Sequence, residues 1–200
     1  MSDALQPVYP TLIPVTEELR GPHITLRRHR ASDAADFFVA LESSRERLAP
    51  WLHFPDPLQT VEAACDWLIH REAAWLLREG LSFAIRYGET NDYLGSIDVH
   101  HIDWDLRFFM LGYWLRDGAE GHGYMGEAVR LVTDYAFTDL AANKVALRCD
   151  ARNTRSASVA ERLGFVREGR LRGEMRAKDG SIADDLQYAL TRGDPRWPTT

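Results

Sequence analysis

Closely spaced glycines between residues 118 and 126, here called the glycine loop, are the part of the sequence with the clearest chemical potential. They follow an apolar, strand-like segment, residues 108–115, and precede a segment with helical periodicity. Such a passage leaves unhindered backbone N–H groups at the positive end of a helix, which suits phosphate. The spacing predicts an anion site over residues 121–126, with a purely structural helix start as the alternative.

The spacing Gly121-x-Gly123-x-x-Gly126 also matches the fingerprint of dinucleotide-binding folds, and Asp150 follows the next predicted strand. Two observations count against that interpretation. In a dinucleotide-binding unit the first glycine comes almost at the strand's end, whereas Gly121 lies six residues after Leu115. The preceding strands are also joined by turns too short for parallel crossovers. A nucleotide-binding oxidoreductase is kept as an alternative.

A second segment with chemical potential follows the next predicted strand, at residues 153–165. Asn153 stands at the start of a short helix, Ser156 lies in its first turn, and Gly164 suits its end. Capping alone explains such residues in most proteins. Their occurrence at this distance from the glycine loop favours the second half of one site.

Together the two segments resemble motifs A and B of the Gcn5-related N-acetyltransferases (GNAT), especially the ribosomal-protein N-terminal acetyltransferase branch (RimJ/RimL type). Motif B, Asn-x-x-Ser-x-x-Val-x-x-Lys/Arg-x-Gly-Phe, is matched at every named position from Asn153 to Phe165. Motif A, Gln/Arg-x-x-Gly-x-Gly/Ala, differs at its first and last positions, Glu120 and Met125. The resemblance covers about residues 22–191. Two further stretches resemble this branch: Gly112-Tyr113-Trp114 before the glycine loop, and Arg-Leu-Ala-Pro-Trp-Leu from Arg47, which resembles the acceptor-side region of the branch.

The resemblance implies acetyl-CoA as cosubstrate and no metal. It places the pyrophosphate on the amides of the glycine loop, the pantetheine arm beside Leu115 and Asn153, and the adenosine phosphate near Arg162. The cofactor-binding residues that it implies are Leu115, Gly121, His122, Gly123, Tyr124, Met125, Gly126, Asn153 and Arg162.

The resemblance also implies direct acetyl transfer, which needs a neutral amine and a proton for the departing thiolate. Many members use a tyrosine as the acid where this chain has Ala160, so the motif B serine, Ser156, is the implied catalytic donor. His100 and Glu174 are the candidate bases, and Asp98 shares the face of His100 by strand alternation. An α-amino acceptor, with a pKa of about 8, needs no base.

The acceptor site is predicted from Trp51, Phe54 and Asp98, with ordinary packing as the alternative for the two aromatic residues. The expected acceptor is a peptide N-terminus, a polyamine or another small amine. A homodimer is an expectation from the resemblance alone. A non-catalytic acyl-CoA-binding sensor is the second alternative function.

The elements that position these residues follow from periodicity. Strands are predicted over residues 22–28, 81–87, 93–102, 108–115, 145–149, 165–172 and 185–191. Helices are predicted from residue 32, over 60–78, from the glycine loop to about 140, and over 156–163. We predict one α/β (α+β) domain with a mixed, mostly antiparallel sheet of about seven strands, flanked by helices. The resemblance implies the GNAT fold with splayed central strands. Predicted boundaries are 1–20 for an extended segment, 21–193 for the acyltransferase domain and 194–200 for a tail.

The charge is unevenly distributed. The chain has 24 Lys and Arg against 30 Asp and Glu, a net charge of −6, which argues against a general nucleic-acid-binding protein. Residues 148–178 nevertheless contain nine basic and four acidic residues. A small phosphate-bearing ligand suits that basic segment, and the acidic remainder suits a cationic acceptor.

The sequence contains no apolar run of bilayer length and does not begin like a secretory signal. Cys65 and Cys149 lie in apolar patterns and outside zinc-ligand spacing, which predicts free thiols. We therefore expect a cytoplasmic protein without nucleic-acid or membrane partners.

Overall fold

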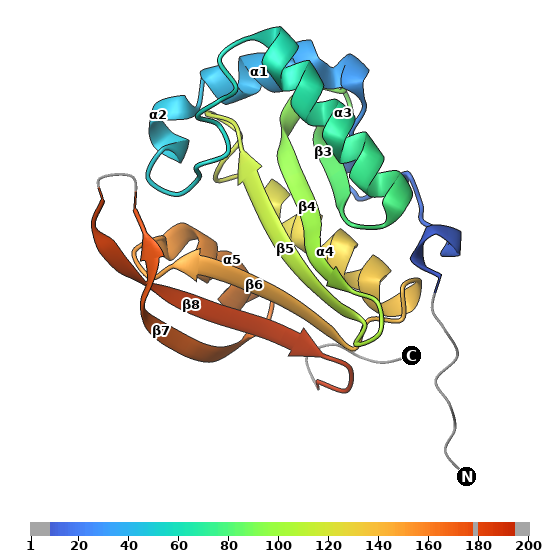
Figure 1. Ribbon diagram of the computed structural model, residues 1–200, viewed down its shortest axis with the longest axis vertical. Helices are drawn as coiled ribbons and strands as arrows, with labels where there is room; N and C mark the ends of the chain where they lie inside the picture. The colour runs from blue at the N-terminus through green and yellow to red at the C-terminus, as the bar shows by residue number, and fades with distance from the viewer. Residues whose placement is uncertain (1–8, 178–179, 195–200) are drawn as a thin grey trace.

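The computed structural model describes residues 9–177 and 180–194, so residues 1–8 and 195–200 of the two predicted terminal segments lie outside the described residues. One mixed sheet organises the chain, in the order β1-β2-β3-β4-β5-β6-β8-β7 (Figure 1). Neighbouring strands are antiparallel except β5 and β6, which are parallel. The strands are β1 (Glu18–Arg20), β2 (Ile24–Arg28), β3 (Leu81–Tyr87), β4 (Tyr93–Asp103), β5 (Phe108–Leu115), β6 (Lys144–Asp150), β7 (Val166–Arg176) and β8 (Ile182–Thr191).

The predicted fold class is confirmed, and the meander β3–β4–β5 keeps the predicted bounds to within one residue. The described sheet has eight strands rather than about seven. The additional strand, β1, pairs with β2 through Glu18↔Arg27 and the next two residues. A strand of three residues is too short to show the alternation by which strands are predicted.

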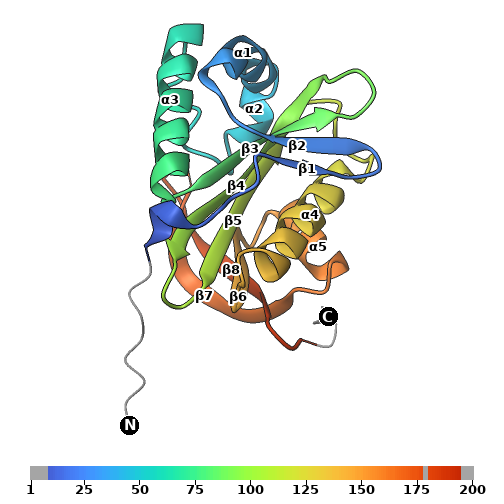
Figure 2. The same ribbon diagram turned by 90° about the vertical axis from the view of Figure 1, so that its right-hand side faces the viewer.

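Helices cover both faces of the sheet: α1, α2 and α3 lie on one face, and α4 and α5 on the other (Figure 2). Helix α3 begins after Thr60, whose hydroxyl accepts the N–H of Ala63 at 3.1 Å, and ends at Arg78, which has a left-handed φ of 60°. None of the described helices is long and apolar enough to cross a membrane. The helices are α1 (Ala34–Glu42), α2 (Arg45–Leu48), α3 (Val61–Leu77), α4 (Tyr124–Thr138) and α5 (Thr154–Arg162), with short 3₁₀ turns at Pro10–Leu12 and Ala31–Asp33.

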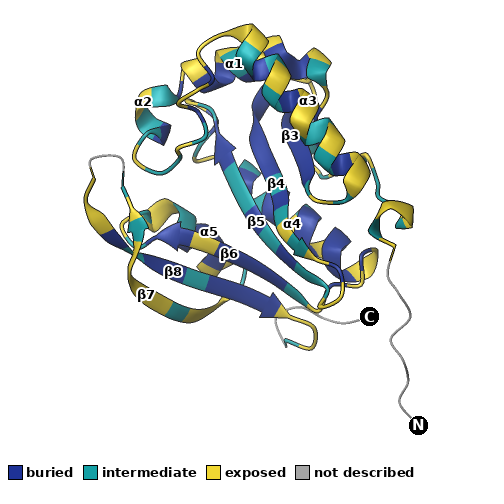
Figure 3. Cartoon of the chain, in the orientation of Figure 1, coloured by how far each residue is buried: buried dark blue, intermediate teal, exposed yellow. Residues whose placement is uncertain are grey.

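The core lies on both sides of the sheet. Buried Val129 and Val132 of α4 belong to the larger apolar cluster, together with Leu147 of β6. Phe37 of α1 and Trp114 of β5 belong to the second cluster, beneath α1 and α3. The strands β6 and β8 are mostly buried and β5 alternates between buried and half-buried residues, whereas the edge strand β7 is mostly exposed (Figure 3). The middle of the sheet is therefore a rigid support.

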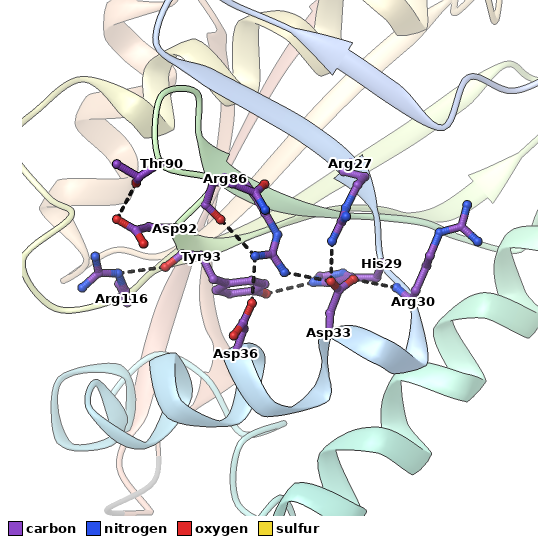
Figure 4. A network of polar contacts seen from close by, with 11 residues as sticks. Arg27, His29, Arg30, Asp33, Asp36, Arg86, Thr90, Asp92, Tyr93 and Arg116 are labelled. Carbon is purple, nitrogen blue, oxygen red and sulfur yellow. Dashed lines mark hydrogen bonds and ion pairs between the residues drawn. The ribbon is translucent and has the colours of Figure 1, made fainter.

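A buried polar network fixes α1 to the sheet (Figure 4). The Arg86 guanidinium donates to Asp33 Oδ1 and Asp36 Oδ2, both at 2.8 Å, and Arg27 donates to the same Asp33 oxygen at 2.5 Å. His29 lies between Ser82 Oγ and the Tyr93 hydroxyl, at 2.7 and 2.8 Å. Burial lowers the pKa of His29 to about 3, so its ring is neutral at physiological pH. The network consequently joins the start of α1 to β2, β3 and β4 through buried and part-buried hydrogen bonds.

The parallel pair β5–β6 separates along its length (Figure 1). The two strands pair over four positions only, from Phe108↔Lys144 to Leu111↔Leu147. Beyond them β5 continues along β4 to Leu115, and β6 continues along β8 to Asp150. This separation confirms the splayed central strands and brings the ends of β5 and β6 to the two sides of one opening.

Candidate active site

A cleft of about 790 Å³ opens where β5 and β6 separate. The end of β5, the glycine loop and the first turns of α5 form its walls, and residues around α2 close one side. The cleft contains both segments that the sequence singled out. Its lining residues are Arg47, Trp51, Tyr113, Trp114, Leu115, Ala119, Glu120, Gly121, Gly123, Tyr124, Met125, Gly126, Asn153, Thr154, Arg155, Ser156, Ser158, Val159 and Arg162.

The glycine loop presents backbone to this cleft. Gly121 and Gly123 have left-handed φ values of 82° and 84°, a conformation that residues with a Cβ rarely adopt. Gly123 is also the N-cap of α4, without a side-chain cap, so the first N–H groups of that helix have no intrahelical partners. A Cβ added at Gly121, Gly123 or Gly126 would meet open space. The loop therefore offers N–H groups and a positive helix end to an anion.

Helix α5 adds cations and a polar N-terminus. Arg155 and Arg162 lie seven residues apart, which is two helical turns, and both line the cleft. The Asn153 side chain accepts the N–H of Ser156 at 3.1 Å, so this asparagine does cap the helix as well as line the cleft.

Two hydroxyl groups meet inside the cleft. The Tyr113 hydroxyl lies 3.0 Å from Ser156 Oγ, and the Ser156 carbonyl lies 3.4 Å from the same phenol. Burial raises the pKa of Tyr113 to about 12, so the phenol keeps its proton at neutral pH. Cys149 of β6 is buried nearby, and burial raises the pKa of its thiol to about 11. The hydroxyl pair can hold or deliver a proton, whereas this thiol is not a nucleophile at neutral pH.

The structure does not bring Asp98 and His100 to the lining of this cleft. Both belong to β4 and pair with Gly112 and Met110 of β5, on the face opposite Tyr113. His100 Nε2 lies 3.0 Å from the position that a Cβ of Gly112 would occupy, so the His100 ring packs over this glycine. Burial lowers the pKa of His100 to about 4, and burial raises that of Asp98. His100 is therefore a weak base.

Three other predicted residues also lie outside the lining. Glu174 is exposed on β7, 3.8 Å from Arg148 Nη2. Phe54 stacks on Trp67 and packs beside Trp114 in the second apolar cluster, which agrees with the packing alternative. His122 is exposed, and its ring centroid lies 5.4 Å from that of Tyr124. The predicted residues that line the cleft are Trp51, Leu115, Gly121, Gly123, Tyr124, Met125, Gly126, Asn153, Ser156 and Arg162.

Three residues that line the cleft and can do chemistry were not among the predicted site residues: Tyr113, Arg155 and Arg47. Side chains alternate along a strand, so Tyr113 must face the side of the sheet opposite to Gly112 and Trp114. This alternation could have predicted the direction of the Tyr113 side chain from the sequence. Arg155 shares a helix face with Arg162, which helical spacing indicates. Arg47 comes from a distant part of the chain; the stretch that begins there resembles the ribosomal-protein branch, but no local pattern predicts its contact with the glycine loop.

Comparison with known proteins agrees with this geometry. Residues 23–166 match the acetyltransferase (GNAT) domain family. The chain is 30% identical over 171 residues to the "Putative ribosomal N-acetyltransferase YdaF" of Bacillus subtilis (strain 168), over 84% of this chain and 88% of the relative. The fold is also shared by two solved structures that have lower sequence identity.

The first is the microcin C7 self immunity acetyltransferase MccE in complex with acetyl-CoA and AMP. Its superposition on this chain has a TM-score of 0.80 with 18% sequence identity, and covers 86% of this chain and 94% of that chain. The second is RimL, a ribosomal L7/L12 alpha-N-protein acetyltransferase, in complex with coenzyme A. Its TM-score is 0.79 at 21% identity, over 90% of this chain and 97% of that chain.

The chain belongs to the GNAT acetyltransferase family. It is an N-acetyltransferase, an enzyme that transfers an acetyl group to an amine, and it is similar to the ribosomal N-acetyltransferases. Neither the family nor the antiparallel meander before the glycine loop supports a nucleotide-binding oxidoreductase. The family match likewise gives no support to a non-catalytic sensor.

Proposed function

We propose that the cleft binds acetyl-CoA and that the acetyl group passes directly from its thioester to the α-amino group of a protein or peptide. One observation carries the proposal: the glycine loop, the arginines of α5 and the Ser156–Tyr113 pair line one cleft between separated strands. The complex of MccE with acetyl-CoA and the name of the YdaF relative support the donor and the acceptor class, respectively.

The residues present fit the chemistry of this donor. Residues 121–126 would hold the pyrophosphate through backbone N–H groups at the start of α4. Arg162 and Arg155 are the cations for the adenosine phosphate, and Asn153 and the end of β5 at Leu115 adjoin the pantetheine arm. When bound, acetyl-CoA supplies an acetyl thioester with a thiolate leaving group.

Ser156 is the proposed proton donor to that thiolate. Its hydroxyl lines the cleft, and the phenol of Tyr113, which stays protonated, can donate to it at 3.0 Å. The acceptor must arrive as a neutral amine. An α-amino group, with a pKa of about 8, loses its proton to water readily, whereas a lysine side chain, near 10.4, does not. The weak basicity of His100 and its place on the other face of the sheet favour this direct route.

Mass spectrometry of an acceptor panel tests the proposal. Peptides with free α-amino groups, the same peptides with blocked N-termini and an internal lysine, and polyamines are each incubated with enzyme and acetyl-CoA. We expect one acetyl group on the free N-termini and none on the blocked peptides. Acetylation confined to lysine or polyamine would overturn the acceptor class. Preferential use of succinyl-CoA in parallel reactions would overturn the acetyl donor.

A further inference from the structure

Glu120 places a carboxylate at the edge of the proposed pyrophosphate site. It precedes Gly121 directly and lines the cleft, and its side chain is 30% exposed. A carboxylate beside a pyrophosphate repels it, so the loop needs a compensating cation. Arg155 approaches Glu120 at 3.7 Å from α5, which is a long and exposed contact.

Arg47 of α2 makes the closer contact. Its Nε lies 2.8 Å from Glu120 Oε1 and also pairs with Asp117, while its Nη2 donates to the Leu115 carbonyl at 2.6 Å. Three anchors from the end of β5 and the following loop therefore hold one guanidinium at the cleft. Nη1 makes no hydrogen bond with the part of the chain that the structure describes, and Arg47 lines the cleft.

We infer that Arg47 is a further cofactor-binding residue: it neutralises Glu120 and directs the N–H groups of Nη1 to the pyrophosphate of the acyl-CoA. The inference rests on the proposed function. The glycine loop itself contains no lysine or arginine, and Arg47 supplies this cation from a distant segment of the sequence. An arginine suits this task because its planar group can serve a carboxylate and a phosphate at the same time.

The test measures CoA and pantetheine binding by calorimetry for the wild type, Arg47→Ala, Glu120→Gln and the double variant. Pantetheine lacks the pyrophosphate but shares the thiol-bearing arm. We expect Arg47→Ala to weaken CoA binding at least tenfold, the range of a charge-assisted hydrogen bond, and to change pantetheine binding less than twofold. In the Glu120→Gln background the same substitution has a smaller effect, because Asp117 is then the one carboxylate that loses Arg47, and the carboxylate beside the pyrophosphate is absent.

Arg45→Ala is the matched control. Arg45 lies on the same short helix, pairs with Glu42 and donates to the carbonyls of Pro55 and Leu58, but it does not line the cleft. We expect this variant to bind CoA within twofold of the wild type. A general loosening of α2 would instead weaken CoA binding in both arginine variants, and that result would overturn the inference.

Two further results would also overturn it: unchanged CoA binding by Arg47→Ala, or an equal loss of CoA and pantetheine. Failure of the proposed function has a different signature, since the wild type would then bind neither ligand.

Discussion

At the scale of single residues, the proposed chemistry depends on two hydroxyl groups. Ser156 is held in the first turn of α5 by the Asn153 cap, and its Oγ lies 3.0 Å from the Tyr113 phenol. The two side chains come from α5 and β5, so the pair spans the opening between the separated strands. Position 160 holds alanine instead of tyrosine, so this hydroxyl pair is the proposed proton source in the cleft.

Ser156→Ala is expected to lower kcat by roughly 10²- to 10⁴-fold, the usual contribution of a general acid. CoA affinity should stay within twofold, because the backbone N–H that Asn153 caps remains. Steady-state kinetics and calorimetry check the two quantities separately. A variant that loses CoA affinity but keeps its kcat would show that the serine only binds.

Tyr113→Phe is expected to lower kcat by about fivefold, because Ser156 loses a hydrogen-bond partner worth about 1 kcal/mol. If the phenol acts through the serine, the double variant should be no slower than Ser156→Ala alone. Kinetics of both single variants and the double variant measure this coupling. Additive losses would mean that Tyr113 acts independently.

At the scale of elements, the sequence predicted where the strands lie better than it predicted which face of the sheet carries the site. Alternation and short turns were sufficient for β3, β4 and β5, and the glycines marked the start of α4. Alternation also shows that Asp98 and His100 share a face. It does not tell which helices cover that face, and the packing of α1 and α3 decides this. Arg47 could not be assigned for a similar reason, because only tertiary structure brings α2 to the glycine loop.

The attachment of α1 to the sheet is tested by Asp33→Ala. The Asp33 side chain is 3% exposed and serves Arg27, Arg86 and the N–H of Arg30, so its removal leaves the buried Arg86 with only the exposed Asp36 as a carboxylate partner. We expect the free energy of unfolding to fall by about 3 kcal/mol. Asp36→Ala is the control: Asp36 also pairs with Arg86 but is 57% exposed, and should cost less than about 1 kcal/mol. Urea denaturation measures both, and equal losses would contradict the prediction.

The same network predicts a pH dependence. Burial holds the pKa of His29 at about 3 in the folded protein, against about 6.5 in the unfolded chain. The unfolded chain therefore binds the extra proton first, so stability is complete above pH 6.5 and falls as the pH drops toward 3. Between pH 7 and 5 the loss from this group is of order 2 kcal/mol. His29→Phe should reduce that difference in urea titrations at the two pH values. An unchanged difference would assign it to other groups.

At the scale of the whole molecule, charge and shape act together. The chain is acidic overall, yet arginines from α2 and α5 converge on a single cleft. Local concentration of positive charge at that cleft offers a multiply charged anionic donor a favourable site.

The separation of β5 and β6 also has a consequence for exchange of backbone hydrogens with solvent. Beyond Leu111, alternate N–H groups of β5 face the opening instead of a neighbouring strand. A strand at the centre of an eight-stranded sheet is usually among the slowest regions to exchange. In residues 112–115, however, the backbone N–H groups that face the opening should exchange as fast as those of an edge strand. Deuterium uptake there should fall when CoA occupies the cleft, while uptake at residues 108–111 stays low throughout. Equal protection with and without CoA would mean that the ligand does not reach this strand.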